Sequence, residues 1–499
     1  MTMLEDAGAS HVAVVGGGIA GLAAARILAR SGVRVTVLEG SPDVGGKLRV
    51  SEIAGLAVDE GAEAMLARRP EGLDLVRDLG RSGDLVNPGT TSSAILSRGA
   101  LRPMPSGQVM GVPSDLRALA ASGVLSPAGL ARVPLDLVLP RTPRGADVSV
   151  AGHIGARVGR EVVDRLVEPL LGGVYAGRAE LLSFESTLPA VAAAARSRRS
   201  LISAAQDVRD AAPRDPGPVF ATLPGGLGTL PHLVAADIAA AGGTVRTGTT
   251  VRALRRRPGG WRLTLGPARE PEHLDADAVL VAVPAAPASR LLKDDVPAAA
   301  RELAGIEYAS MAIITLVYPA GAFPRLPKGS GYLVPAKEAA HGVKAVTFSS
   351  VKWPHLRDRD PGLVAVRCSI GRFGEERVLQ RPDEELTAAA RAELAATCGV
   401  AGPPAGTRVT RWGGGLPQYN VGHAGRVARI RAAVAAEPGL AVAGAAYDGL
   451  GIPACVASAR AAANQVLDYL RGPGRPRGRE GAEDVSDGAG GQAEGARTQ

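Results

Sequence analysis

The sequence predicts an α/β fold that combines a discontinuous, Rossmann-like nucleotide-binding domain with a mixed-sheet domain and a helical insertion. The first indication is the stretch VAVVGGGIAGLAAARILARSGVRVTVLEG (12–40), whose pattern is strand, glycine turn, helix, strand. The second is the Pro- and Ala-rich region 88–215, where helical spacing is repeatedly interrupted. The third is a group of strand patterns at 308–319, 345–354 and 362–371, which predicts a second sheet.

The glycine turn predicts a nucleotide site. Gly16, Gly18 and Gly21 have the G-x-G-x-x-G spacing, which lets a pyrophosphate approach the backbone at a helix N-terminus. Glu39 ends the second strand, where a carboxylate suits two ribose hydroxyls. This motif alone leaves NAD and FAD as alternatives. The predicted nucleotide contacts in this stretch are Gly16, Gly17, Gly18, Ile19, Ala20, Gly21, Glu39 and Gly40.

Later segments favour FAD. In GSPDVGGK, Gly45 and Gly46 place a second bare backbone turn near the phosphates, and Lys47 adds a positive charge. GLAVDEGAEAML (55–66) adds a further turn. The region 439–470 then predicts a strand, a loop that Gly444 opens, and a helix whose unpaired N–H groups suit a flavin edge. Taken alone, that last region could instead be the final strand–helix unit of a sheet.

The composition limits the class of protein. A chain of 499 residues has room for about three domains of ~150 residues each. The hydrophobic content of 46% supports a large core, while 3% aromatic residues predict pockets lined mainly by aliphatic side chains. The net charge of +8 comes from scattered residues, so no nucleic-acid-binding surface is expected.

The cysteines and the N-terminus predict a cytoplasmic protein. Cys368, Cys398 and Cys455 are isolated, which fits a reducing compartment and offers no metal spacing. The opening MTMLEDAGAS is acidic and does not resemble a secretory leader. No run of 18 strongly apolar residues occurs, so no transmembrane segment is expected.

The domain order follows from these patterns. We expect disorder at both ends, because the Gly-rich tail lacks large apolar residues. Between the disordered ends 1–9 and 471–499, the nucleotide-binding domain is expected to comprise the segments 10–66, 216–292 and 429–470. The substrate domain is expected to comprise the segments 67–87 and 293–428, and the helical insertion is expected at 88–215.

With these motifs assembled, the chain from about residue 11 to 470 resembles the bacterial protoporphyrinogen and coproporphyrinogen oxidases, within the amine-oxidase-like flavoproteins. The soluble group from Gram-positive-type bacteria is the most similar in pattern. The stretches that carry the resemblance are LRPMPSGQVMGVPSDL (101–116), VEPLLGGVYAGRAELLS (167–183), SVKWPH (350–355), RWGGGLPQYNVGHAGRV (411–427) and YDGLGIPACVASA (447–459).

The resemblance implies a p-hydroxybenzoate-hydroxylase-like or amine-oxidase-like architecture with non-covalent FAD. The implied reaction is oxidation of coproporphyrinogen III to coproporphyrin III in haem biosynthesis, with protoporphyrinogen IX as the alternative substrate. Molecular oxygen is the implied acceptor and hydrogen peroxide the by-product. A ferrochelatase-type enzyme is an implied partner, and peripheral contact of the helical insertion with a membrane remains open.

The family also implies roles for individual residues. Gly61, Ala62, Glu63 and Ala64 match the segment that runs past the flavin, and Val251 matches a main-chain contact to the adenine. The loop that meets the flavin edge matches Gly449, Ile452 and Pro453, and Gly444, which opens this loop, is a further expected cofactor contact. The implied substrate contacts are Arg69 at the pocket mouth, its neighbour Arg68, and Val174 in the pocket wall.

We identify no catalytic side chain, because the flavin carries the difficult chemistry in such a reaction. His153, His232 and His423 are candidate bases by residue type only, and we expect structural roles for them.

Three other functions are alternatives for a chain with these motifs. An amine oxidase is disfavoured because the strand 308–319 lacks the lysine that amine oxidases usually carry there. A carotenoid desaturase on the same scaffold and a non-catalytic porphyrin carrier are the remaining alternatives. Complete FAD contacts argue against the carrier, which has no use for a redox cofactor.

Overall fold

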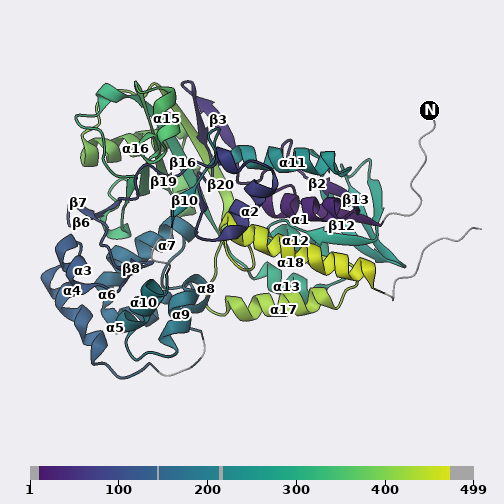
Figure 1. Cartoon of the computed structure of the whole chain (residues 1–499), viewed down its shortest axis with the longest axis horizontal. Helices are drawn as coiled ribbons and strands as arrows, with labels where there is room; N and C mark the ends of the chain where they lie inside the picture. Colours follow the sequence, from purple (N-terminus) through teal and green to yellow (C-terminus); the bar gives the residue numbers. More distant parts are fainter. Residues whose placement is uncertain (1–9, 143–144, 146, 213–216, 473–499) are drawn as a thin grey trace, which may run out of the picture.

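The computed structural model describes residues 10–142, 145, 147–212 and 217–472. The expected disordered ends 1–9 and 473–499 lie outside the described residues, whereas Arg471 still belongs to the last helix. Figure 1 shows three regions: nucleotide-binding layers, a large sheet, and a cluster of helices.

The nucleotide-binding region is built on a five-stranded parallel sheet in the order β11-β2-β1-β15-β21. Its strands are short runs of β-branched and small residues that are mostly buried, as parallel sheets covered on both faces require. They are β1 (His11–Val15), β2 (Arg34–Leu38), β11 (Thr244–Arg246), β15 (Ala278–Val281) and β21 (Leu440–Val442).

Two layers cover this sheet. One face packs against α1 (Ile19–Arg30), α11 (Leu230–Ala240) and α18 (Ile452–Arg471), with α1 and α18 side by side (Figure 1). The opposite face packs against an antiparallel sheet and three helices. These elements are β12 (Val251–Arg257), β13 (Gly260–Leu265), β14 (Glu272–Ala276), α12 (Ala285–Leu292), α13 (Pro297–Ala304) and α17 (His423–Ala435).

The second sheet has seven strands in the order β20-β16-β19-β18-β17-β6-β7 and is mixed, because β17 and β6 run parallel. One face is covered by α16 (Asp383–Cys398), whose Leu386, Ala390 and Leu394 enter the shared core. The strands are β6 (Ala94–Ser97), β7 (Ala100–Pro103), β16 (Tyr308–Pro319), β17 (Gly331–Leu333), β18 (Val343–Phe348), β19 (Leu363–Ile370) and β20 (Gly406–Pro417).

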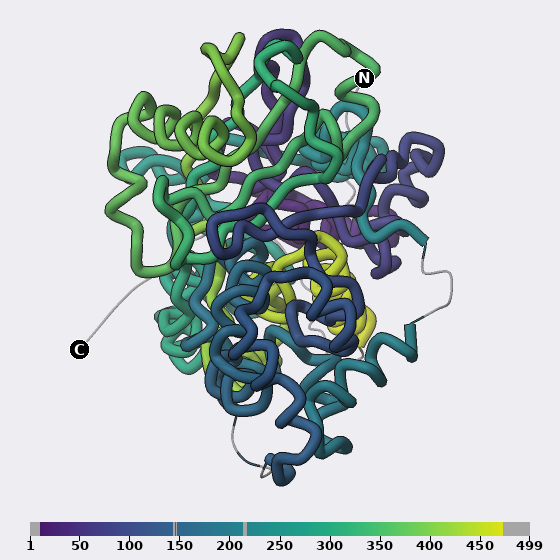
Figure 2. The backbone as a smooth tube through the Cα atoms, turned by 90° about the vertical axis from the view of Figure 1, so that its left-hand side faces the viewer, coloured from purple at the N-terminus to yellow at the C-terminus, as the bar shows by residue number. Residues whose placement is uncertain are grey.

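The helical region has its own apolar core and occupies the lower portion of Figure 2, in blue and teal. Its helices are α3 (Leu116–Ser122), α4 (Pro127–Arg132), α5 (Val150–Val158), α6 (Arg160–Val162), α7 (Glu168–Tyr175), α8 (Phe184–Thr187), α9 (Pro189–Ala195) and α10 (Leu201–Asp210). A π-helical turn, Val163–Val167, joins α6 to α7. Among the described residues, no helix is both long and apolar enough to cross a membrane.

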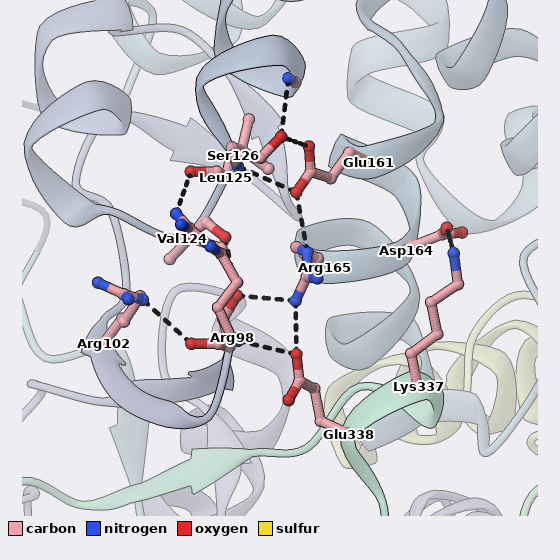
Figure 3. A network of polar contacts seen from close by, with 12 residues as sticks. Arg98, Arg102, Val124, Leu125, Ser126, Glu161, Asp164, Arg165, Lys337 and Glu338 are labelled. Carbon is pink, nitrogen blue, oxygen red and sulfur yellow. Dashed lines mark hydrogen bonds and ion pairs between the residues drawn. The ribbon is translucent and has the colours of Figure 1, made fainter.

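Arginine side chains join the helical region to the seven-stranded sheet (Figure 3). Arg165, in the π-helical turn, donates to Ser97 Oγ at 3.0 Å and to Glu338 Oε1 at 2.7 Å. Glu338 Oε1 also accepts the backbone N–H of Arg98 at 2.8 Å. Arg165 Nε donates to Glu161 Oε1 at 3.0 Å, so one guanidinium connects three segments that are far apart in sequence.

The structure corrects four expectations about elements. Residues 94–103 lie inside the range expected to be helical, yet β6 and β7 extend the large sheet. The expected strand 345–354 ends at Phe348, and Ser349–Lys352 is a short helix, α14. The expected divide at 292–293 separates α12 from α13, although both pack on the nucleotide-binding sheet. The expected divide at 428–429 falls within α17.

A buried ion pair in the helical region yields a prediction about stability. Asp136 is 0% exposed and accepts from Arg157 Nε at 2.5 Å, Ser200 Oγ at 2.6 Å and Ile202 N–H at 2.9 Å. We expect Asp136→Ala to lower the free energy of unfolding by about 3–5 kcal/mol, because it leaves the Arg157 charge buried and unpaired. Urea titration of the variant measures this loss.

Asp207→Ala is the matched control, because it removes an exposed pair with Arg198 in the same region. We expect little change in its unfolding midpoint. Equal midpoints for the two variants would contradict the proposed importance of Asp136.

Candidate functional site

The turn after β1 is shaped for close backbone approach. Gly16 has φ +109°, and a Cβ there would lie 2.7 Å from the carbonyl oxygen of Ala282. A Cβ on Gly21 would lie 1.9 Å from the carbonyl oxygen of Gly16, so α1 starts in direct contact with the turn. Both positions therefore require glycine, as the fingerprint predicts.

Glu39 lies at the expected end of this site. Its Oε2 accepts the N–H of Gly17 at 2.6 Å and its Oε1 accepts the N–H of Ser41 at 2.7 Å. The N–H of Gly45 donates to the Gly17 carbonyl at 2.8 Å, which brings the second glycine turn beside the first. Both carboxylate oxygens are thus fixed next to the first turn of the fingerprint.

The segment that is expected to meet the adenine lies against Gly40. A Cβ on Gly40 would lie 3.2 Å from Thr250 Oγ1, so Gly40 and the residue before β12 are in contact. The N–H of Thr249 donates to the Glu39 carbonyl at 2.7 Å. Val251, the first residue of β12, therefore follows a segment that is bonded to the residue predicted to bind the ribose.

Two helices begin here without a side-chain cap. The N-cap of α1 is Gly18 and the N-cap of α18 is Gly451, and neither helix has a side-chain capping bond. Gly444, with φ +126°, approaches α1, since a Cβ there would be 3.9 Å from Ala20 Cβ. Unpaired N–H groups and positive dipole ends suit an anionic diphosphate and flavin carbonyl oxygens. Ile19, Ile452 and Pro453 occupy the first turns of these helices.

Lys47 and Cys455 lie near one another at this junction. Burial lowers the pKa of Lys47 from its ordinary value. Burial also raises the pKa of the Cys455 thiol to about 11, despite the nearby Lys47 charge. Cys455 is 5% exposed and is therefore a protonated, packed thiol at neutral pH. Gly46 lies at the same turn, with φ +59° and its Cβ position 3.5 Å from Gly18 Cα.

The segment Gly61–Ala64 is held by a buried ionic cluster. Glu63 accepts from Lys352 Nζ at 2.7 Å, from Arg367 Nη1 at 2.8 Å and from Ser349 Oγ at 3.0 Å. Burial opposes ionisation of Glu63, but the two cations outweigh it and hold the pKa of this carboxyl below its ordinary range. Arg367 Nη2 also donates to the carbonyl of Gly61.

The same segment is pressed against the second glycine turn. A Cβ on Gly61 would lie 1.9 Å from the carbonyl oxygen of Lys47, so the two backbones touch. Ala62 is exposed and Ala64 is half-buried. The side chains on either side of Glu63 in this segment are therefore single methyl groups.

Asp59 precedes this segment and anchors a second loop. Its carboxylate oxygens accept the N–H groups of Leu227 at 3.0 Å and Gly228 at 2.8 Å. Burial raises the pKa of Asp59 to about 6, although these two N–H groups act in the opposite direction. Asp59 is consequently a buried carboxyl that keeps its proton to a higher pH than an exposed aspartate does.

Tyr419 braces the loop at the start of α18. Its phenol donates to the carbonyl of Ala445 at 2.6 Å and accepts the N–H of Gly449 at 2.8 Å. His423 stacks on the Tyr419 ring with centroids 3.9 Å apart, and its Nε2 lies 3.1 Å from the Tyr447 carbonyl oxygen. One aromatic pair thus fixes the backbone between Ala445 and Gly449.

The three residues expected to contact substrate differ in their surroundings. Arg69 precedes α2 (Pro70–Asp78), and its Nη2 pairs with Glu71 Oε1 at 2.6 Å. Arg68 has no polar partner among the described residues. Val174, near the end of α7, is 44% exposed. Of the two arginines, Arg68 has the guanidinium that is free to bind an anion.

Four contributors were missed by sequence reasoning: the Glu63 side chain, Lys352, Arg367 and Tyr419. Glu63 was expected to contribute as part of the segment that runs past the flavin, and not through its side chain. Lys352 and Tyr419 lie within SVKWPH and RWGGGLPQYNVGHAGRV, two stretches that carry the family resemblance. The presence of Lys352 and Tyr419 in these stretches was the one sequence signal of a role for them. Their partners could not be predicted, because they come from distant segments.

The other two histidines each have a protein contact. His153 stacks on Phe184 with centroids 4.3 Å apart. His232 is exposed, and its Nε2 lies 3.5 Å from Asp43 Oδ2. In the portion of the chain that the structure describes, no group of His, Cys, Asp and Glu residues has the arrangement of a metal site.

Comparison with known proteins identifies similar chains over nearly the whole length. Residues 19–467 match the family of flavin-containing amine oxidoreductases. Coproporphyrinogen III oxidase of Mycobacterium tuberculosis (strain ATCC 25618 / H37Rv) is 39% identical over 473 residues, covering 92% of this chain and 97% of that protein. Coproporphyrinogen III oxidase of Bacillus subtilis (strain 168) is 33% identical over 478 residues, covering 93% and 99%. Protoporphyrinogen oxidase of Bos taurus is 30% identical over 497 residues, covering 91% and 98%.

Solved structures agree with this similarity. A protein from Exiguobacterium sp. 255-15, provisionally named a protoporphyrinogen oxidase, superposes with a TM-score of 0.81 at 31% identity and covers 93% of this chain and 99% of its own. Cyclohexylamine oxidase from Brevibacterium oxydans has a TM-score of 0.68 at 17% identity, covering 93% of this chain and 100% of its own. The second similarity concerns the fold alone.

The brace formed by Tyr419 predicts a coupled loss of stability and flavin retention. Tyr419→Phe leaves the Ala445 carbonyl and the Gly449 N–H without their partner, which costs about 1–3 kcal/mol of stability. We also expect more flavin to be lost on gel filtration, because the loop before α18 loses its brace. Thermal unfolding and the flavin-to-protein absorbance ratio measure the two effects.

Tyr332→Phe is the matched control, since this buried phenol bonds to Glu393 and Thr397 of α16, which covers the large sheet. It should lower stability and leave flavin retention unchanged. Equal flavin loss in both variants would mean that retention follows general stability.

The raised pKa of Asp59 predicts a pH dependence. Because the native state holds this proton more tightly than the unfolded state, Asp59 lowers stability as pH rises from about 4 to about 6. A shift of that size corresponds to roughly 2–3 kcal/mol. Asp59→Asn removes the titration, so the stability difference, parent minus variant, should fall across this window and be flat above it. A difference independent of pH would contradict the assignment.

Proposed function

The chain belongs to the flavin-containing amine oxidoreductase family, and we propose that it oxidises coproporphyrinogen III to coproporphyrin III with FAD as its cofactor. The observation that carries this proposal is the end-to-end similarity to relatives named coproporphyrinogen III oxidase, at 39% identity for the mycobacterial protein. The bovine relative with the alternative substrate, protoporphyrinogen, is 30% identical, which makes protoporphyrinogen IX the second candidate.

Each region of an FAD molecule has a proposed set of contacts in this chain. The carboxylate of Glu39 would take the ribose hydroxyls, and the uncapped start of α1 would take the diphosphate. The backbone of Gly61–Ala64 and the first turn of α18 would flank the flavin. When bound, FAD supplies the acceptor for the hydride removed in each two-electron step and passes the electrons to molecular oxygen.

The protein's own role in the reaction is to hold the cofactor and the substrate and to enclose the reacting centre. A porphyrinogen becomes a porphyrin by three successive two-electron oxidations, and each reduces one oxygen molecule to hydrogen peroxide. The segment fixed by Glu63, Lys352 and Arg367 keeps the backbone around the reacting centre rigid. No proton-accepting side chain is assigned, because His153, His232 and His423 each have a protein contact of their own.

The carboxylate arms of the substrate require cations. Coproporphyrinogen has four propionates, and a carboxylate that leaves water without a partner is costly. Arg68 and Arg69 are the proposed partners, with Val174 as an apolar wall. A guanidinium binds a carboxylate through two parallel hydrogen bonds.

The proposed setting is the cytoplasm, where the free thiols of Cys368, Cys398 and Cys455 would remain reduced. The product is a metal-free porphyrin, so the reaction class that consumes it is metal insertion. A ferrochelatase-type enzyme is therefore the proposed partner.

Anaerobic mixing tests the function directly. Coproporphyrinogen III added to the flavin-loaded protein should bleach the flavin absorbance and produce porphyrin fluorescence, and air should restore the flavin band. With protoporphyrinogen IX, growth of the Soret band should be slower. Porphyrin binding without bleaching would identify a carrier, and faster turnover of protoporphyrinogen would reverse the choice of substrate.

The buried thiol predicts that the flavin is not covalently attached. Because the pKa of Cys455 is raised to about 11, its nucleophilic thiolate form is scarce at neutral pH. Acid precipitation should therefore release FAD into the supernatant, and Cys455→Ala should retain the parental flavin content. A yellow protein pellet in the parent, absent in Cys455→Ala, would contradict this.

Arg68 and Arg69 predict that substitution changes the KM for the substrate more than it changes kcat. Arg68→Ala should raise the KM for coproporphyrinogen about ten-fold, a loss of about 1–2 kcal/mol. We expect kcat to change less, since a propionate contact exists before the reaction as well as during it. Arg69→Ala should have a smaller effect on KM, because its guanidinium already pairs with Glu71.

Arg77→Ala is the control, since this exposed arginine on α2 pairs with Asp74 and lies on the same helix as Glu71. Steady-state kinetics with both substrates measure KM and kcat. An unchanged KM for Arg68→Ala would remove this residue from the site, and a fall in kcat alone would assign it a role in orientation.

A further inference from the structure

A pair of exposed apolar side chains stands on the short ladder between β5 (Met65–Leu66) and β10 (Phe220–Ala221). Leu66 and Phe220 are directly opposite one another in the antiparallel register. They are 37% and 38% exposed, while Met65 and Ala221 on the other face are 1% exposed each. A two-stranded ladder usually presents polar side chains on its open face. We call Leu66 and Phe220 the apolar step.

The Phe220 ring is held in place from one side. Lys352 Nζ lies 5.2 Å from the ring centroid and 4.9 Å from the centroid of the Trp353 ring. The lysine is itself fixed, because its ammonium pairs with Glu63 at 2.7 Å and its side chain is only 16% exposed. A ring positioned by a cation loses little conformational freedom when a second group packs on it.

The apolar step is accompanied by positive charge and lies next to the cofactor segment. Arg68 follows Leu66 by two residues and has no polar partner among the described residues. Glu63, which holds Lys352, belongs to the segment expected to run past the flavin. A single exposed apolar residue is ordinary. Two that face each other, with an arginine that has no polar partner among the described residues two positions along the chain, match a flat apolar molecule with carboxylate arms.

We propose that the apolar step is a substrate-binding subsite, in which Phe220 and Leu66 pack against a pyrrole ring of the tetrapyrrole while Arg68 binds one of its carboxylate arms. This subsite rests on the proposed function and extends it to Phe220 and Leu66, to which the sequence assigned no role. Lys352 is a positioning residue in this arrangement, since it holds the Phe220 ring and does not touch the substrate. In this arrangement the stretch SVKWPH contributes to substrate binding through Lys352.

The test measures binding as well as turnover. Coproporphyrin III, the stable and fluorescent product, is titrated into the FAD-loaded full-length protein for the parent, Phe220→Ala and Phe220→Leu. Phe220→Ala should raise the Kd for coproporphyrin and the KM for coproporphyrinogen about five- to ten-fold, the scale of an aromatic contact. Phe220→Leu keeps an apolar side chain and should recover some of this loss. We expect kcat to stay within about two-fold of the parental value, because the contact is made in the ground state.

Leu326→Ala is the matched control, since Leu326 is 44% exposed and lies in the loop before β17. It should bind coproporphyrin like the parent, and thermal unfolding should show that both Phe220 variants are folded. A second prediction concerns charge: Arg68→Ala should reduce the dependence of the Kd on salt concentration, whereas Phe220→Ala should leave that dependence unchanged.

The outcomes separate this subsite from the function on which it rests. If the parent oxidises coproporphyrinogen but the Kd of Phe220→Ala stays within about two-fold of the parental value, the subsite is wrong and the function stands. Unchanged binding in this variant would also point to a protein partner as the occupant of the apolar step. If the parent neither binds the porphyrin nor bleaches with the porphyrinogen, both proposals fail.

Discussion

The carboxylate of Glu63, buried between Lys352 and Arg367, is the interaction on which the rest of the site depends. Removing three charges from water costs several kcal/mol for each ion, and the cluster offsets this only through short, well-directed bonds. The bonds reach across the molecule, because Glu63 follows the first glycine turns while both cations belong to the second sheet region. Because Arg367 also binds the Gly61 carbonyl, the backbone beside the predicted cofactor is fixed by the same cluster.

The fold explains why such a tie is needed. The nucleotide-binding sheet collects strands from residues 11–38, 244–281 and 440–442, so the chain leaves this region and returns to it more than once. Each departure builds a separate core, and cores packed independently can shift against each other. The cluster around Glu63 and the guanidinium of Arg165 each join two of these regions. Apolar contacts alone would not define how the regions are positioned against each other.

Sequence patterns anticipate what is local and miss what depends on distant partners. The strand at 308–319 and the glycine fingerprint were predicted correctly, because period and turn chemistry are properties of neighbouring residues. Helix α13 was expected in the substrate domain and α17 was divided between the two domains, whereas both pack on the nucleotide-binding sheet. An apolar stripe indicates that a helix buries a face and not which layer receives it. The helix at Ser349–Lys352 replaced an expected strand, and its Lys352 turns toward Glu63, 289 positions away in sequence.

The distribution of fixed groups also bears on the chemistry. Tyr419, Glu63 and Asp59 each use their polar atoms on backbone or on cations, and the bonds of Tyr419 and Glu63 rigidify segments that are predicted to meet the cofactor. A site designed for proton transfer would instead keep a titratable side chain free at the reacting atoms. This chain uses its buried polar groups to hold a backbone still, while the cation Arg68 and the apolar step remain available. That division is what a reaction carried by a cofactor requires: rigidity where the cofactor lies, and apolar and positive surface where an anionic, ring-shaped substrate arrives.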